Sequence, residues 1–262
     1  MALTNEGALL TDRQRRLQVR TAITADSQAR RLWDSTLDLD DLKGSQPAWR
    51  RAMIRLLETW WKISAEQAAD YLPEFRRAEI GGKTISVDMP KFDRKAKAAD
   101  IDWLGSTNVL WHIDTGQKPQ DAYQSARNLF LGEFHKQVMD GGRRTMREWA
   151  SNDSQAIGWR RVSDGHPCAF CAMLVSRGPV YTSERKALLR ASDRTKFHPN
   201  CGCSVEVVYG DWQPTQQEQQ WVDTYYVAAE SLPKNEPRSA DSILPIMRRI
   251  GAFRDSPKTI KG

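Results

Sequence analysis

The sequence that decides the fold reads Asp164-Gly-His-Pro-Cys168-Ala-Phe-Cys171 and, after an intervening segment, Phe197-His198-Pro-Asn-Cys201-Gly-Cys203. These two motifs hold every cysteine of the chain. A C-x2-C pair opposite an H-x2-C-x-C element supplies five soft or borderline ligands, which is one more than a tetrahedral zinc ion needs. The spacing therefore predicts a small module built around a metal ion.

The spacing also predicts which atoms converge. Cys168 and Cys171 form a knuckle whose turn points both sulfurs at one ion. Cys201 and Cys203 lie on the same face of an extended segment, so their thiolates converge too. We expect structural zinc, held by four of the five candidates, with His198 either replacing a cysteine or supporting the site from outside. Two alternatives stay open, namely buried reduced thiols that pack a small β-rich module, and a disulfide formed later.

Composition limits the class of protein. The chain has 262 residues, 40% of them hydrophobic, a formal charge of +6 and a pI near 9.2. Such a surface is compatible with DNA but is not diagnostic of a nucleic-acid reader. No run approaches 18 apolar residues, and the first residues resemble no secretory signal, so we expect no membrane span. The reducing cytosol expected for such a chain favours metal ligation over disulfides.

The first part of the chain, residues 1–150, is predicted to be a helical domain. Apolar residues recur at helical spacing throughout it. Pro47 suits the first turn of the second helix, and Ser64-Ala-Glu-Gln67 fits a capping box that opens a third. Gly141-Gly142 is expected to end or bend the last helix. The expected helices include residues 11–35, 93–113 and 119–149.

The rest of the chain has a different pattern. Residues 158–211 are turn-rich, with short apolar runs and a predicted strand at residues 205–209. Residues 212–262 contain one helix-like stretch, 216–231, followed by a tail whose prolines make a long helix improbable. We expect that tail to be extended or to lie on a partner. The fold class is therefore mainly α with a small, turn-rich α+β cysteine module near the C-terminal third.

The cysteine region carries a family resemblance. Gly158-Trp-Arg-Arg-Val-Ser-Asp-Gly-His-Pro-Cys-Ala-Phe-Cys, then Arg177-Gly-Pro-Val-Tyr181, then Phe197-His-Pro-Asn-Cys-Gly-Cys-Ser-Val resembles the phage Mu F-like (MuF) minor head proteins of the actinobacterial-phage type. The resemblance covers about a fifth of the chain. It implies a protein made in the host cytoplasm and placed inside the virion near the portal vertex. It also implies a role in head assembly, DNA packaging or genome delivery, with the portal and the inner capsid surface as partners.

Basic residues suggest a second kind of contact. As a group, they are predicted to touch the phosphates of packaged double-stranded DNA without sequence preference, or the portal. As solvated helix faces they would need no ligand at all. The candidates are Arg13, Arg15, Arg16, Arg20, Arg143, Arg144, Arg160 and Arg161.

Tryptophans in the helical part are a further candidate for portal contact. Their aromatic surface exceeds what two helices alone need to bury, which is typical of interface anchors. The alternative is that they fill the core of a helical bundle. The residues concerned are Trp49, Trp60, Trp61, Trp103 and Trp111.

Catalysis is not expected. A nuclease would recruit Asp164, His166, His198 and Asn200 around a metal, but the sequence offers no nucleophile–base or acid pair. A redox role for C-x2-C lacks the βαβ pattern of thioredoxin-like proteins. We therefore expect a non-enzymatic minor head protein. The alternatives are a metal-dependent nuclease, a toxin-like effector, or a DNA-binding protein without sequence preference.

Overall fold

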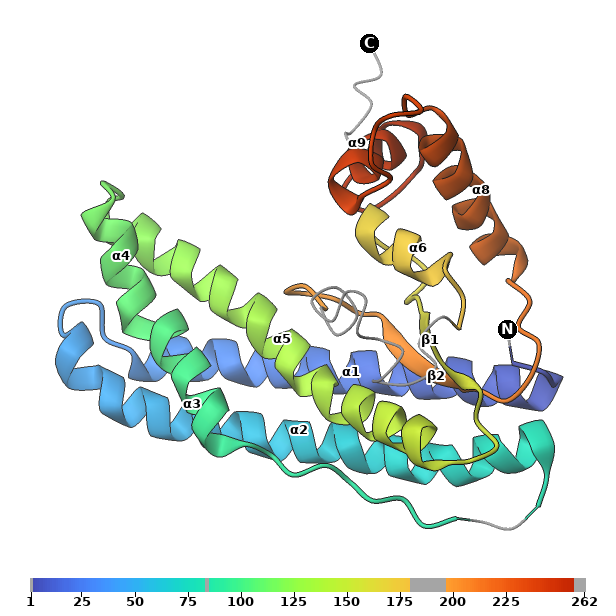
Figure 1. Ribbon diagram of the computed structural model, residues 1–262. Coiled ribbons are helices and arrows are strands. Elements are labelled where there is room, and N and C mark those ends of the chain that lie inside the picture. The colour runs from blue at the N-terminus through green and yellow to red at the C-terminus, as the bar shows by residue number, and fades with distance from the viewer. Residues whose placement is uncertain (1, 83–84, 180–196, 257–262) are drawn as a thin grey trace.

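Three long helices form the base of the molecule. The computed structural model describes residues 2–82, 85–179 and 197–256. Helices α1 (Asn5–Thr36), α2 (Leu42–Ile80) and α5 (Pro119–Asn152) pack against one another over most of their lengths (Figure 1). The mainly helical fold with a small strand-containing cysteine region is confirmed.

The bundle is held by an aromatic core. The rings of Trp33, Trp49 and Phe130 form a closed triangle, with centroids 5.2, 5.1 and 5.3 Å apart. Trp61 is also buried, only 2% exposed. Trp49 and Trp61 therefore belong to the core and are not interface anchors, because ring packing within the chain, for Trp61 against Phe92, already buries them.

Helix α2 runs without interruption through two positions where the sequence predicted helix starts. The capping box predicted at residues 64–67 is wrong. Ser64 is fully buried, and its hydroxyl bonds the side chain of Gln18 and accepts from the backbone N–H of Gly142. It thus joins the three long helices instead of capping one, and Pro47 lies inside α2 after its first turn.

The helix predicted at residues 93–113 is broken in the structure. It consists of α3 (Arg94–Asp102), a π-helical turn η1 (Trp103–Thr107) and α4 (Asn108–Asp114). Gly105 leaves helical geometry, with φ −85° and ψ −130°, and a Cβ there would lie 2.4 Å from the Trp49 ring. Close packing on a core tryptophan is thus the physical reason for the break.

Helix α5 was predicted well except at its glycine pair. It continues to Asn152, past Gly141 and Gly142. A Cβ on Gly141 would lie 2.1 Å from the Trp61 carbonyl oxygen, and one on Gly142 would meet the Gln18 side chain at 2.8 Å. The two glycines let α5 approach its neighbours closely and do not end the helix.

A two-stranded antiparallel sheet lies between the bundle and a second helical layer. Strands β1 (Gly158–Val162) and β2 (Ser204–Val208) pair antiparallel, which confirms the strand predicted at 205–209. Their inward side chains share a core with α2 and α5, through residues such as Phe75, Met146 and Trp149. The hydrophobic packing therefore crosses the boundary that we placed between residues 150 and 158.

The second layer contains α6 (Ala169–Val175), α8 (Gln216–Glu230) and α9 (Ala240–Ile250), which lie above the two-stranded sheet (Figure 1). The helix predicted at 216–231 is confirmed. The extended tail is wrong for the described residues, because Ile243 and Met247 of α9 are buried against α6 and α8. Residues 257–262 lie outside the described part. Among the described helices, none is both long and apolar enough to cross a membrane.

Candidate metal centre

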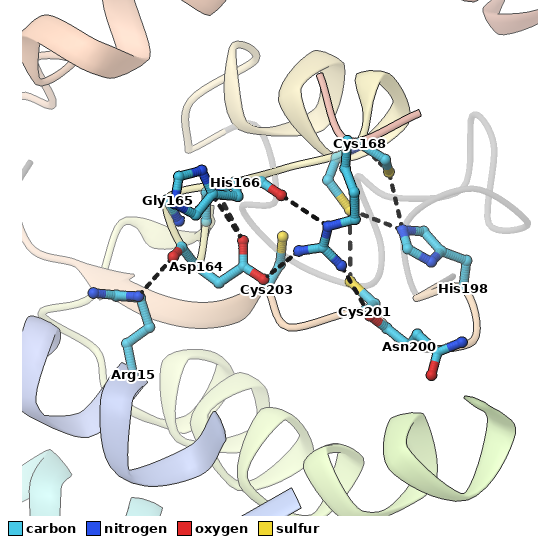
Figure 2. Close-up of polar contacts among 12 residues, drawn as sticks. Arg15, Asp164, Gly165, His166, Cys168, His198, Asn200, Cys201 and Cys203 are labelled. Atoms are coloured by element: carbon cyan, nitrogen blue, oxygen red, sulfur yellow. Dashed lines mark hydrogen bonds and ion pairs between the residues drawn. The ribbon is translucent and has the colours of Figure 1, made fainter. Parts of the chain in front are cut away.

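The five predicted ligands come together where the two-stranded sheet meets α6. Cys168 is the N-cap of α6, and Cys171 lies in its first turn. His198, Cys201 and Cys203 lie on the loop that leads into β2 (Figure 2). Val180 and Tyr181, part of the motif that resembles MuF proteins, lie outside the described residues.

Two overlapping sets of three donor atoms are each close enough to share one ion. The Nε2 atom of His198 lies 3.0 Å from the sulfur of Cys168 and 3.3 Å from that of Cys171. The sulfurs of Cys171 and Cys201 are 3.5 Å apart. Two sets of three donors each fall within 4.8 Å, and Cys171 belongs to both; Cys203 completes the second set. All four cysteines are free thiols, so the alternative of a disulfide is not realised in this structure.

The orientation of His198 suits a metal ligand. Its Nδ1 donates to its own neighbour, the carbonyl oxygen of Pro199, at 2.7 Å. That bond fixes the ring and leaves Nε2 facing the sulfurs, as is usual for metal-binding histidines. The turn that presents the ring is tight, since Asn200 adopts a positive φ of 59° and its N–H bonds the carbonyl oxygen of Gly132 in α5 at 2.9 Å.

Without a metal, the cluster shares its protons unevenly. The pKa of Cys168 falls to about 5, because Cys171 donates a hydrogen bond to it and, despite burial, His198 lies beside it. The pKa of Cys201 is also lowered, chiefly by the thiols of Cys171 and Cys203. The pKa of Cys171 is raised by the same contacts, first with Cys168. Bonding to Cys168 raises the pKa of His198 to about 9.

These groups fit a metal ion. The lowered pKa of Cys168 and the raised pKa of His198 favour a thiolate beside an imidazolium, and a divalent cation would replace the protons of the cluster. Thiolates and imidazole are the donors that borderline-soft cations prefer. The separations of 3.0 to 3.5 Å are slightly shorter than the roughly 3.5–3.8 Å between the ligands of a tetrahedral zinc ion. The cluster could therefore hold a metal ion.

Two arginines predicted to contact DNA instead support the cluster. Arg143 is only 2% exposed; its guanidinium donates to the carbonyl oxygen of Cys201 at 2.6 Å and to that of Cys203 at 2.7 Å. The ring of Phe197 lies between Arg143 and Arg161, at 3.7 and 3.9 Å from their guanidinium carbons. Because both are buried in their own chain, neither is available to phosphates. The sequence analysis did not find this role, although Phe197, which packs between the two arginines, belongs to the cysteine motif.

Arg160 is a third correction. It is 3% exposed and forms ion pairs of 2.6 Å with Glu206, its cross-strand partner, and with Glu218 of α8. Burial tends to lower the pKa of Arg160, but the two carboxylates raise it overall. These buried ion pairs link the two-stranded sheet to α8, so Arg160 is not a DNA contact either.

The remaining predicted arginines lie nearer the surface. Arg13, Arg16 and Arg20 on α1 are exposed, and Arg144 on α5 is partly exposed. Arg15 is partly buried, and it donates to the carbonyl oxygen of Asp164 at 2.9 Å, so it ties α1 to the loop before Cys168 (Figure 2). Only the four surface residues remain candidates for contact with another molecule.

The residues proposed for a nuclease do not gather around one ion. The carboxylate of Asp164 accepts from Arg254 at 2.7 Å, and a Cβ on Gly202 would meet it at 2.3 Å. Arg254 also bonds the carbonyl oxygens of His166 and Asn200. The Asp164–Arg254 pair thus joins the two cysteine motifs to each other and to the segment after α9, a role not visible in the sequence.

The fold and site together define a helical protein with a buried cysteine–histidine cluster able to hold a metal ion. The VG15 protein family matches residues 8–228, so the chain belongs to that family. It is also similar to the "Gene 15 protein" of Mycobacterium phage D29, at 23% identity over 186 residues, covering 58% of this chain and 67% of that protein. No solved structure matches. The link to bacteriophage proteins is thereby supported, whereas the MuF resemblance stays a prediction.

Proposed function

We propose that this chain is a non-enzymatic minor head protein of the MuF-like type, which docks on the portal or the inner capsid beside it. The proposal combines the motif resemblance with membership in a family that has a phage relative. In this role the protein takes part in head assembly, DNA packaging or genome delivery from inside the virion.

An exposed aromatic patch carries the docking part of this proposal. Trp103, Leu110 and Trp111 are 55%, 47% and 50% exposed, and they lie on η1 and α4. Large aromatic side chains left in water at one site are typical of interface anchors. The bundle already has a complete core without them, so their exposure supports a partner there.

Co-expression with the portal protein tests the docking. A portal ring isolated at physiological salt should retain this chain, and particles made without the chain should package or deliver DNA poorly. If the ring never retains the chain and such particles remain fully infectious, the minor-head assignment is wrong.

We also propose that the ion is zinc and that its role is structural. The support is the donor set, four thiols and one imidazole, in a module of two five-residue strands and one seven-residue helix. A bound ion would add folding free energy to this module. Cys171, Cys201 and Cys203 are buried, which limits the access of a substrate to the ion, as in structural sites.

Metal analysis under reducing conditions tests this point. We expect about one zinc per chain. Cys171→Ser should abolish metal binding, because Cys171 belongs to both donor sets. Among single substitutions of Cys168, His198, Cys201 and Cys203, one should leave most of the metal binding intact, because a tetrahedral ion needs only four donors. Absence of metal from the purified protein, together with unchanged melting of Cys171→Ser, would exclude the structural zinc.

A further inference from the structure

An open groove between α2 and α3 collects basic side chains that the sequence did not single out. Helix α3 lies against α2 (Figure 1), and the groove between them has a volume of about 600 Å³. Its charged lining residues are Arg50, Arg51, Arg55, Arg94, Lys95 and Asp102. Five cations and one carboxylate leave a formal charge of +4, from residues that are far apart in the chain.

Three of these cations have no partner within the described part of the protein. Arg50 is paired with Asp102, and Arg94 with Glu58. The side chains of Arg51, Arg55 and Lys95 are exposed and form no ion pair or hydrogen bond with any residue of the described ranges. An unpaired cluster of like charges repels itself, so it is stabilised by an anionic ligand.

The arrangement suits a phosphate backbone. Arg51 and Arg55 are four residues apart, so they project from the same face of α2. Lys95 approaches from the opposite wall, on α3. Guanidinium groups bind phosphate through paired hydrogen bonds, and cations on two walls can contact successive phosphates of one strand.

The apolar lining of the groove indicates how specific such binding is. It consists of Ile54, Ala98 and Ala99, whose side chains have no donor or acceptor. Reading a base edge requires such groups, while phosphate contacts carry no sequence information. A ligand in this groove would therefore be held by charge alone.

The surface of α1, where the sequence placed the DNA contacts, is different. Arg16 pairs with Asp12 at 2.7 Å. Arg13 lines a smaller groove together with Asp70 and Glu74, so carboxylates offset its charge. The positive potential is therefore more concentrated between α2 and α3 than along that part of α1.

We propose that the α2–α3 groove binds the phosphate backbone of double-stranded DNA without sequence preference. Arg51, Arg55 and Lys95 make the contacts, while the charges of Arg50 and Arg94 are offset by Asp102 and Glu58. This proposal does not depend on docking at a portal, and it is tested with the purified protein alone.

Fluorescence anisotropy with a labelled duplex of about 30 base pairs, on the full-length protein as isolated, tests the groove. We compare two triple variants that each lower the formal charge from +6 to +3: R51A/R55A/K95A, and the control R13A/R16A/R20A. Because the groove variant lacks all three cations that meet phosphates, it should bind at least ~10-fold more weakly at ~0.1 M salt, and its log–log salt slope should shrink by about 2.7. The control should change affinity by less than about threefold, and a scrambled duplex should bind equally well.

Three results would overturn the proposal. The first is an unaltered protein that does not bind duplex even at low salt. The second is a control that weakens as much as the groove variant, which would make binding a matter of overall charge. The third is normal DNA binding by the groove variant, which would favour an acidic protein as the ligand of the groove. A thermal melt of each variant confirms folding, and the single substitution Lys95→Glu, at an exposed site, serves if the triple variant is unstable.

Discussion

The helical bundle and the cysteine cluster are stabilised in different ways. The bundle buries large aromatic rings, so its free energy of folding comes from apolar area spread over three long helices. The cluster rests on a few polar contacts: the donor atoms and the guanidinium group of Arg143. Truncation of one side chain in the bundle should therefore lower the free energy of unfolding in proportion to the apolar area removed. Removal of one polar group from the cluster should instead disturb the arrangement of the donor atoms.

The largest expected effect is in the bundle. Trp33→Ala removes a fully buried ring that packs on Trp49, Tyr123 and Phe130. We expect a loss of about 3–5 kcal/mol in the free energy of unfolding, measured by urea denaturation followed by circular dichroism. Trp33→Phe, which keeps one ring, should cost clearly less. Equal losses for the two variants would mean that ring packing is not what stabilises the bundle.

The next largest effect is expected at Arg143, whose guanidinium group supports the cluster. Arg143→Met keeps most of the side-chain volume but leaves the carbonyl oxygens of Cys201 and Cys203 without their donor. We expect a cost of about 2–3 kcal/mol and a lower metal affinity, measured by competition with a chelator. The adjacent Arg144→Met is the control, since its ion pair with Glu148 is long, at 3.9 Å, and partly exposed, and it should cost under about 0.5 kcal/mol. Normal metal affinity in Arg143→Met would show that the cluster does not need this support.

A smaller effect is expected where the two regions touch. A Cβ on Gly132 of α5 would lie 2.6 Å from the side-chain nitrogen of Asn200 and 3.0 Å from Pro199. Gly132→Ala should therefore displace the turn that carries His198, at a cost of about 1–3 kcal/mol, partly offset by about 1 kcal/mol of helix propensity. The net loss should be near 1 kcal/mol, and the visible spectrum of the cobalt-substituted protein should change.

The matched control for Gly132→Ala is Leu129→Ala, at a half-exposed position on the same helix. It should leave the cobalt spectrum unaltered. If Gly132→Ala itself is more stable than the unaltered protein and has the same spectrum, the bundle does not position the histidine.

The sequence predicts these two regions unequally well. The five metal-ligand candidates were found by spacing alone, because chelation fixes which residues lie near one another. The long helices were found by apolar periodicity. The range predicted for α5, 119–149, agrees closely with Pro119–Asn152, whereas α2 was wrongly divided at Pro47 and Ser64. What spacing cannot reveal is a contact between distant segments, such as Arg143 with the Cys201 carbonyl, which looks like surface charge in the sequence.

The errors have the same origin. Ser64-Ala-Glu-Gln67 has the pattern of a capping box, but the buried hydroxyl of Ser64 instead joins α1 and α5. Pro245 suggested an extended tail, yet the burial of Ile243 and Met247 stabilises an 11-residue helix around it. In each case tertiary packing outweighed a local preference worth only about 1–3 kcal/mol.

The smallest effect on stability should come from the exposed tryptophans, and it separates folding from docking. Trp103 and Trp111 are about half exposed, so the double substitution W103A/W111A should change the free energy of unfolding by under about 0.5 kcal/mol per site, far less than Trp33→Ala. If the patch on η1 and α4 docks on the portal, the same variant should lose retention by the portal ring in co-purification. Tyr226→Ala, which removes an equally exposed ring on α8, should lose none. Retention of W103A/W111A at the level of the unaltered protein would move the docking surface elsewhere, because an aromatic anchor contributes to binding only where its partner buries it.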